Sequence, residues 1–156
     1  MITLKGIAAA PGINIAPAYK FGKEEFEIPQ QPIKVEEIPL QIQLFEESLI
    51  STRKEIIELQ KRISQEMGQD EAQIFDAHLL VLEDRMLIEE VISRLKKDQV
   101  SVPYIFSEVL KKYIEVFSKI EDEYLRERIA DLNDVGKRIL RNLLGKEHRS
   151  LKDLKD

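Results

Sequence analysis

The sequence predicts an all-α core in which two antiparallel helical hairpins pack together as a four-helix bundle. Apolar residues recur every three or four positions through most of residues 35–145, as on one face of an α-helix. Gly68 and Gly145 stand where two of these patterns end, and helices commonly end at glycine. Only short joints separate the patterns, and short joints favour antiparallel neighbours.

The composition excludes several classes of function. The 156 residues suit one domain, or one domain and a small piece of another, and include no cysteine, which excludes disulfides, thiolate metal sites and a cysteine nucleophile. A net charge of -5, from 24 Lys and Arg against 29 Asp and Glu, argues against nucleic-acid binding and suits a basic protein partner. No membrane span and no signal region are visible, so we expect a cytoplasmic protein that does not bind membranes.

Residues 1–21 differ from the rest of the chain and are nearly uncharged. Alternation over residues 2–4 and 13–18 predicts short strands or extended chain. Two short strands are marginally stable alone and need a larger sheet. Residues 22–34 contain Pro29 and Pro32 and are predicted to form a linker.

The first long helix is predicted over residues 35–67. Pro39 must lie in its first turn, because proline deeper in a helix removes a hydrogen bond and clashes with the preceding turn. Gly68 would end the helix. The apolar stripe consists of Ile38, Ile42, Phe45, Leu49, Thr52, Ile56, Leu59, Ile63 and Met67.

A second helical stretch is predicted from Asp70 to Lys97, with a restart near Glu83. Asp84 would be the N-cap of the restarted segment, because a carboxylate there can accept a hydrogen bond from the first turn. The apolar face consists of Ile74, Phe75, Leu79, Val81, Leu82 and Met86, and His78 projects from its middle.

Leu80 does not fit this face, since a helical wheel places it on the other side among acidic residues. It is either a stray surface leucine or part of a surface that receives a basic partner through an apolar contact. His78 is open to three interpretations: a phosphoacceptor, an interface residue, or a half-buried histidine with its hydrogen bonds satisfied.

Two further helices complete the predicted bundle. Ser101 would cap the first of them, with Pro103 in its first turn and Tyr113 in its apolar stripe. The second covers residues 122–144, and Gly136 in its apolar seam would let a neighbouring helix approach closely. The seam follows a strict heptad spacing through Leu125, Ile129, Leu132, Gly136, Ile139 and Leu143.

The residues themselves show no catalytic motif. The glycines form neither a GxGxxG nor a P-loop, and His78 and His148 do not belong to a zinc-ligand pattern. The many acidic pairs on helices are more typical of a solvated surface than of acid–base catalysis.

Three stretches resemble Enzyme I of the bacterial phosphoenolpyruvate:sugar phosphotransferase system. Residues 6–13, GIAAAPGI, resemble that family's opening strand and turn. Residues 74–84, IFDAHLLVLED, resemble its helix with an IF-acid-small-H-x-x-x-L-E-D pattern, and residues 122–145 resemble its last helix in this region.

The resemblance implies a division of the chain. Residues 35–145 would be the helical domain that docks the phosphocarrier HPr, and residues 1–21 the first strands of an incomplete α/β phosphohistidine domain. Residues 146–156 would lead back toward that domain. The family's glycine-rich Thr-Ser-His motif and its C-terminal barrel are absent, so we expect this chain alone to be inactive. No cofactor is expected here; magnesium, phosphoenolpyruvate and a homodimer belong to the full-length family protein.

The resemblance also implies which residues dock HPr. They are Asp70, Ile74, His78, Leu80, Val81, Asp84, Leu87, Phe117, Leu125 and Arg128. Arg85 and Met86 depart from the acidic continuation of many members. A paralogue of the nitrogen-related or dihydroxyacetone kinase branch therefore stays open, as does a non-catalytic helical adaptor or oligomerisation module, which the heptad seam favours.

Overall fold

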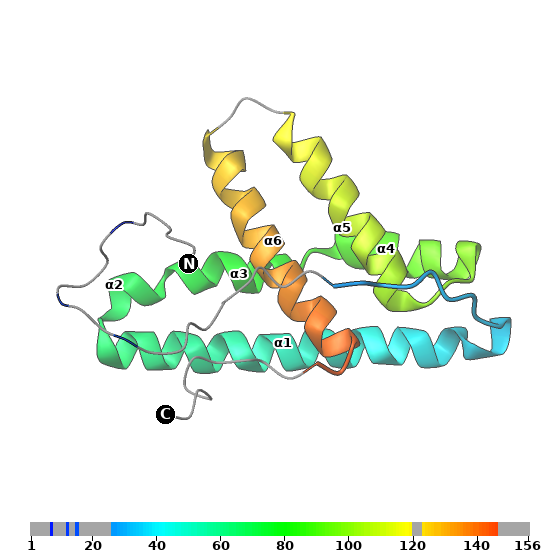
Figure 1. Ribbon diagram of the computed structural model, residues 1–156, viewed down its shortest axis with the longest axis horizontal. Helices are drawn as coiled ribbons and strands as arrows, with labels where there is room; N and C mark the ends of the chain where they lie inside the picture. The colour runs from blue at the N-terminus through cyan, green and yellow to red at the C-terminus, as the bar shows by residue number, and fades with distance from the viewer. Residues whose placement is uncertain (1–6, 8–11, 13–14, 16–25, 120–122, 147–156) are drawn as a thin grey trace.

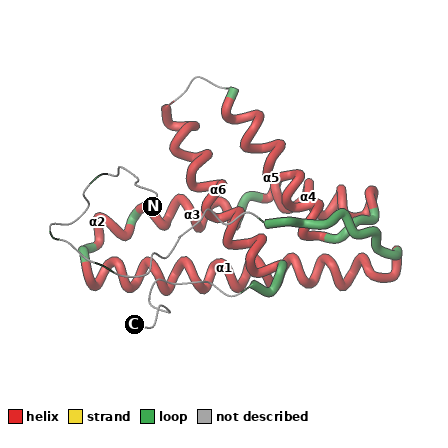
Figure 2. The backbone as a smooth tube through the Cα atoms, viewed as in Figure 1, coloured by secondary structure: helices red, strands yellow, loops and turns green. Residues whose placement is uncertain are grey.

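The computed structural model describes residues 7, 12, 15, 26–119 and 123–146, excluding the side chains of residues 123–127. Within that part, helices are the only regular elements, so the predicted helical core is confirmed (Figures 1 and 2). The elements are η1 (Val35–Glu37), α1 (Ile38–Glu66), α2 (Gln69–Ala72), α3 (Ile74–Leu82), α4 (Arg85–Asp98), α5 (Val102–Ser118) and α6 (Glu123–Leu143).

The helices form two antiparallel groups, one of α1 with α2, α3 and α4, and the other of α5 with α6. The 29-residue α1 is the base of the molecule in Figure 1, and α2, α3 and α4 run back along it. α5 turns away from α4, and α6 returns antiparallel to α5 (Figure 1). Because α6 packs against α1, α3 and α5, it connects the two groups into one core.

The strands predicted in residues 1–21 find no support. Most of that segment lies outside the described residues, and Ile7, Gly12 and Ile15 form no strand. In the described part of the chain, β pairing is limited to an isolated antiparallel bridge between Pro32 and Val100.

The second half of the predicted linker packs against the helices as extended chain. The Ile33 N–H donates to the Gln99 carbonyl at 2.9 Å, and the Ser101 N–H donates to the Gln31 carbonyl at 2.8 Å. Phe26 packs against the core, and the Lys146 ammonium lies 5.1 Å from the centre of its ring. The chain therefore enters and leaves the helical domain at neighbouring points.

Most predicted helix ends are confirmed. Gly68 follows α1 with a φ of 124°, a backbone conformation that favours glycine. Asp84 caps α4, since its Oδ1 accepts from the Leu87 N–H at 3.1 Å. The hydroxyl of Ser101 makes no such bond at the start of α5, so that prediction is wrong in its mechanism. Gln41 replaces it: its Oε1 accepts from the Val102 N–H at 2.8 Å.

The predicted apolar faces need three corrections. Ile74 is 60% exposed, Met86 75% and Met67 64%. The second helical stretch breaks at Gln73 and again at Glu83–Asp84. After the second break the next buried residue is Leu87, five positions after Leu82, so Met86 no longer faces the core. Met67 follows the last residue of α1, where the chain turns away from the core.

The core lies where α6 meets the other helices. Phe45 and Phe106 contact each other with ring centroids 5.7 Å apart. Gly136 permits a close helix contact, because a Cβ there would lie 2.4 Å from Leu110 Cδ2. Val135 and Leu140 are also buried, which makes the covered face of α6 wider than the predicted heptad seam.

A polar contact fixes α6 against α1 within this core. Asn142 Nδ2 donates to Thr52 Oγ1 at 2.9 Å and to Glu55 Oε1 at 3.0 Å. Thr52 Oγ1 in turn donates to the Ser48 carbonyl at 2.8 Å. Buried polar groups need such partners, so this set of bonds favours one register of α6 on α1.

Candidate protein-docking groove

A shallow groove of about 60 Å³ opens where α3, α4, α5 and α6 meet. Its floor is mostly apolar, and charged groups at Asp84, Arg128 and Asp131 surround it. We call it the junction groove. It is lined by Ala77, Leu80, Val81, Asp84, Leu87, Tyr113, Phe117, Arg128, Asp131 and Leu132.

Six of the ten residues predicted to dock a partner line the junction groove. They come from four helices that are separated along the sequence, and they are Leu80, Val81, Asp84, Leu87, Phe117 and Arg128. Leu80 is 56% exposed, as its position on the helical wheel predicts. The core packing of α6 on α3 and α5 brings these side chains together.

The other four predicted residues do not line the groove. Asp70 is exposed on α2, and Ile74 is exposed on the first turn of α3. The side chain of Leu125 lies outside the described part of the chain. His78 faces α6 beside the groove, and only 12% of its side chain is accessible.

The His78 ring connects α3 to α6. Its Nδ1 lies 3.0 Å from the Ile74 carbonyl oxygen and, because a carbonyl can only accept, Nδ1 carries the proton and donates. Its Nε2 lies 3.7 Å from Asp131 Oδ1, and its ring packs on Phe75 with centroids 5.5 Å apart. The ring is therefore half-buried with one hydrogen bond, at Nδ1, while its Nε2 faces Asp131 beyond hydrogen-bond distance.

Acidic groups shape the electrostatics at the α4–α5 side of the groove. Burial raises the pKa of the Tyr113 phenol above its ordinary value of 10.0, and the negative charges of Glu90 and Asp84 raise it further. The positive charge of Lys112 lowers this pKa, and its Nζ pairs with Glu90 Oε1 at 2.8 Å across the two helices. Tyr113 therefore presents a protonated hydroxyl at neutral pH.

Sequence reasoning missed four groove residues, namely Ala77, Tyr113, Asp131 and Leu132. Tyr113 and Leu132 belong to apolar stripes, so the pattern predicted them as core. Ala77 and Asp131 each lie three residues from a predicted docking residue on the same helix, and that spacing was the available signal.

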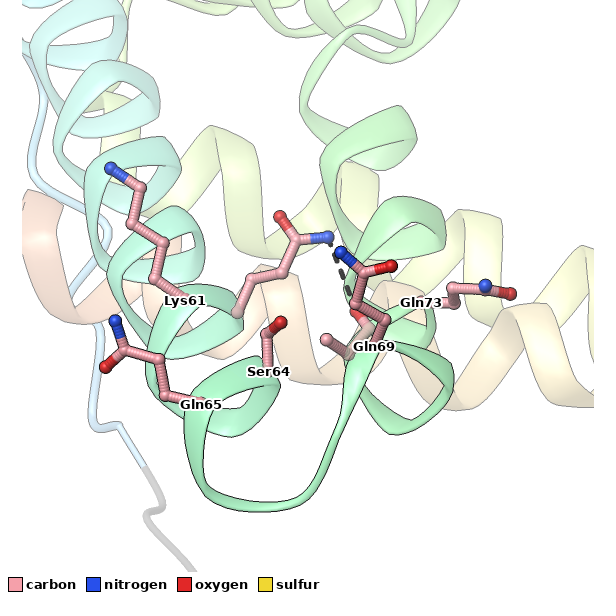
Figure 3. A pocket seen from close by; sticks show the side chains of 7 residues that line it. Lys61, Ser64, Gln65, Gln69 and Gln73 are labelled. Atoms are coloured by element: carbon pink, nitrogen blue, oxygen red, sulfur yellow. Dashed lines mark hydrogen bonds between the residues drawn. The ribbon is translucent and has the colours of Figure 1, made fainter.

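A second, more open hollow lies between the end of α1 and α2 (Figure 3). It has a volume of about 420 Å³, and its lining is mostly amide and hydroxyl groups. Gln60 Nε2 closes one side by donating to the Ala72 carbonyl at 3.3 Å and to Asp76 Oδ1 at 2.8 Å. Its seven lining residues include no acid and no histidine, so they offer no acid–base pair.

Across the described residues, no helix has both the length and the apolar character that crossing a membrane requires.

Comparison with known proteins identifies the family. Residues 5–128 match the family described as PEP-utilising enzyme, N-terminal. The chain is 34% identical over 142 residues to the phosphoenolpyruvate-protein phosphotransferase of Staphylococcus epidermidis and 35% identical over 147 residues to that of Bacillus subtilis strain 168. These matches cover 91% and 94% of this chain but 25% of each relative, so the chain spans about a quarter of their length.

A solved structure shares the fold. An NMR solution structure of Enzyme I (nEIt) is similar with a TM-score of 0.75 and 34% sequence identity, over 85% of this chain and 54% of that one. The chain therefore belongs to the PEP-utilising enzyme N-terminal family, and its resemblance to Enzyme I of the phosphotransferase system is confirmed.

Proposed function

We propose that this chain docks the phosphocarrier HPr through the junction groove, so that a phosphoryl group can pass to HPr from a phosphohistidine elsewhere in the full-length protein. One observation carries the proposal. Six side chains that the family resemblance assigns to HPr docking line one groove, and they come from residues 80–87, from α5 and from α6.

The chemistry of the groove suits a small partner with an apolar patch and basic surroundings. Leu80 and Phe117 offer apolar surface that docking would remove from water. Asp84 and Asp131 would attract basic side chains during encounter, and the net charge of -5 supports the same steering. Asp84 retains Oδ2 for a partner while Oδ1 caps α4.

We expect the chain to bind HPr without accepting phosphate from phosphoenolpyruvate itself. His78 is largely enclosed between α3 and α6, and neither it nor His148 has the neighbours of the family's phosphohistidine. Incubation with phosphoenolpyruvate and magnesium should leave the mass of the chain unchanged. A gain of one phosphate would overturn this division of roles.

Calorimetric titration of the chain with unphosphorylated HPr tests the docking proposal. We expect one binding site per chain and an affinity that weakens as salt rises from about 50 mM to about 500 mM, because salt screens charges near the surface. An unrelated basic protein of similar size and net charge serves as the control. Equal binding of the two proteins would reduce the interaction to non-specific charge attraction, and no heat with HPr would refute docking.

The adaptor alternative loses its main support. The heptad seam of the last helix favoured an adaptor or oligomerisation module. In the structure, however, Leu132, Gly136 and Ile139 of that seam are buried against other helices of the same chain. A seam that is covered within the chain is not available for pairing with a second copy.

A further inference from the structure

Tyr113 lines the junction groove, although neither the helical pattern nor the family resemblance assigned it to docking. Its ring packs edge-on against Phe117, with centroids 6.2 Å apart and an angle of 69° between the ring planes. The hydroxyl makes no hydrogen bond to any residue that the structure describes. An apolar wall of the groove thus contains a hydroxyl that water can reach in the free chain and that a docked partner would cover.

The surroundings of Tyr113 define what that partner can be. Asp84 and Glu90 lie close enough to raise the pKa of the phenol, so at neutral pH the hydroxyl keeps its proton and can donate it. The same two carboxylates disfavour a negatively charged acceptor by repulsion. A neutral oxygen, such as a main-chain carbonyl at the end of a helix or in a turn, meets both conditions.

We propose that Tyr113 is a specificity-determining residue of the junction groove, whose hydroxyl donates a hydrogen bond to a neutral carbonyl oxygen of the docked partner. This inference rests on the proposed function. A partner that covers the groove with apolar surface alone would strip water from the hydroxyl and leave it unsatisfied, which is unfavourable. A partner that brings a carbonyl oxygen to this position therefore binds more tightly than one that offers only apolar surface.

Calorimetric titration of HPr into the Tyr113→Phe variant tests the inference, with Tyr104→Phe as the matched control. Tyr104 is partly buried on the same helix but does not line the groove. We expect Tyr113→Phe to weaken binding by about 2- to 10-fold, as for a lost neutral hydrogen bond, and Tyr104→Phe to leave it unchanged. Unchanged binding by Tyr113→Phe would overturn the inference and leave docking intact, whereas equal weakening by both variants would overturn its link to the groove.

A second measurement separates a direct contact from a loss of stability. In the complex with HPr, the Tyr113 hydroxyl proton should become observable by NMR, because a hydrogen bond that is shielded from water slows its exchange. Its absence from the spectrum of the saturated wild-type complex would overturn the inference even if Tyr113→Phe were destabilised. A wild-type chain that fails to bind HPr would refute the proposed function, and this inference with it.

Discussion

Replacement of Leu80 by alanine tests how the junction groove works. Leu80 is 56% exposed and lines the groove, so docking would remove much of that surface from water. Full burial of a leucine side chain is worth about 1.5–3 kcal/mol. Burial of the exposed 56% is then worth about 0.8–1.7 kcal/mol, so Leu80→Ala should weaken HPr binding about 4- to 17-fold.

The assay is calorimetric titration with HPr, with Leu40→Ala as the matched control. Leu40 is 55% exposed on α1 and does not line the groove, so its truncation removes a similar exposed surface at a different place. Both variants should unfold close to the wild-type denaturant midpoint, because neither side chain is buried. Equal affinities of Leu80→Ala and the wild type, or equal losses in the two variants, would refute the reasoning.

Three other predictions concern the groove and the helices that form it. Gly136→Ala should lower the free energy of unfolding by about 1–3 kcal/mol, because its Cβ would meet buried Leu110; an unchanged denaturant midpoint would contradict the close contact. Asp84→Ala should lose about 1 kcal/mol of capping energy and weaken docking, whereas Asp84→Asn should keep the cap and weaken docking only; equal thermal stability of the two variants would argue against capping. The pKa of Tyr113 is raised in the folded chain, so its contribution to stability is complete below the unfolded pKa of 10.0 and is lost as the pH rises through the folded pKa. Tyr113→Phe should therefore lose less stability between about pH 8 and about pH 11 than the wild type in denaturant titrations, and identical profiles would disprove the shift.

Local sequence signals predicted the helices and most of their ends. The pattern before Gly68 gave the length of α1, and Asp84 marked the restart at α4 because a carboxylate before a first turn has a specific hydrogen-bonding role. The break at Gln73 carried no glycine or proline and was missed. Ile74 was also placed on the buried face although it is exposed.

The helical pattern alone indicated a groove residue only where an apolar side chain lay outside the apolar face of its helix. Leu80 stood apart from the apolar face of its helix, and the structure places it at the groove. Tyr113 fitted the core stripe of α5, and nothing in that helix alone indicates that α4 and α6 leave one side of the ring open. The position of His78 against Asp131 likewise depends on how α6 packs on α3, which no local pattern encodes.

The most direct test is an NMR titration of the isotopically labelled chain with unphosphorylated HPr. We expect the chemical-shift changes to cluster on the residues of the junction groove, with Leu80, Tyr113 and Phe117 among the largest, and the hollow between α1 and α2 to stay unperturbed. Changes centred on that hollow or on the outer face of α1, or no changes at saturating HPr, would contradict the claim that the junction groove is the docking site.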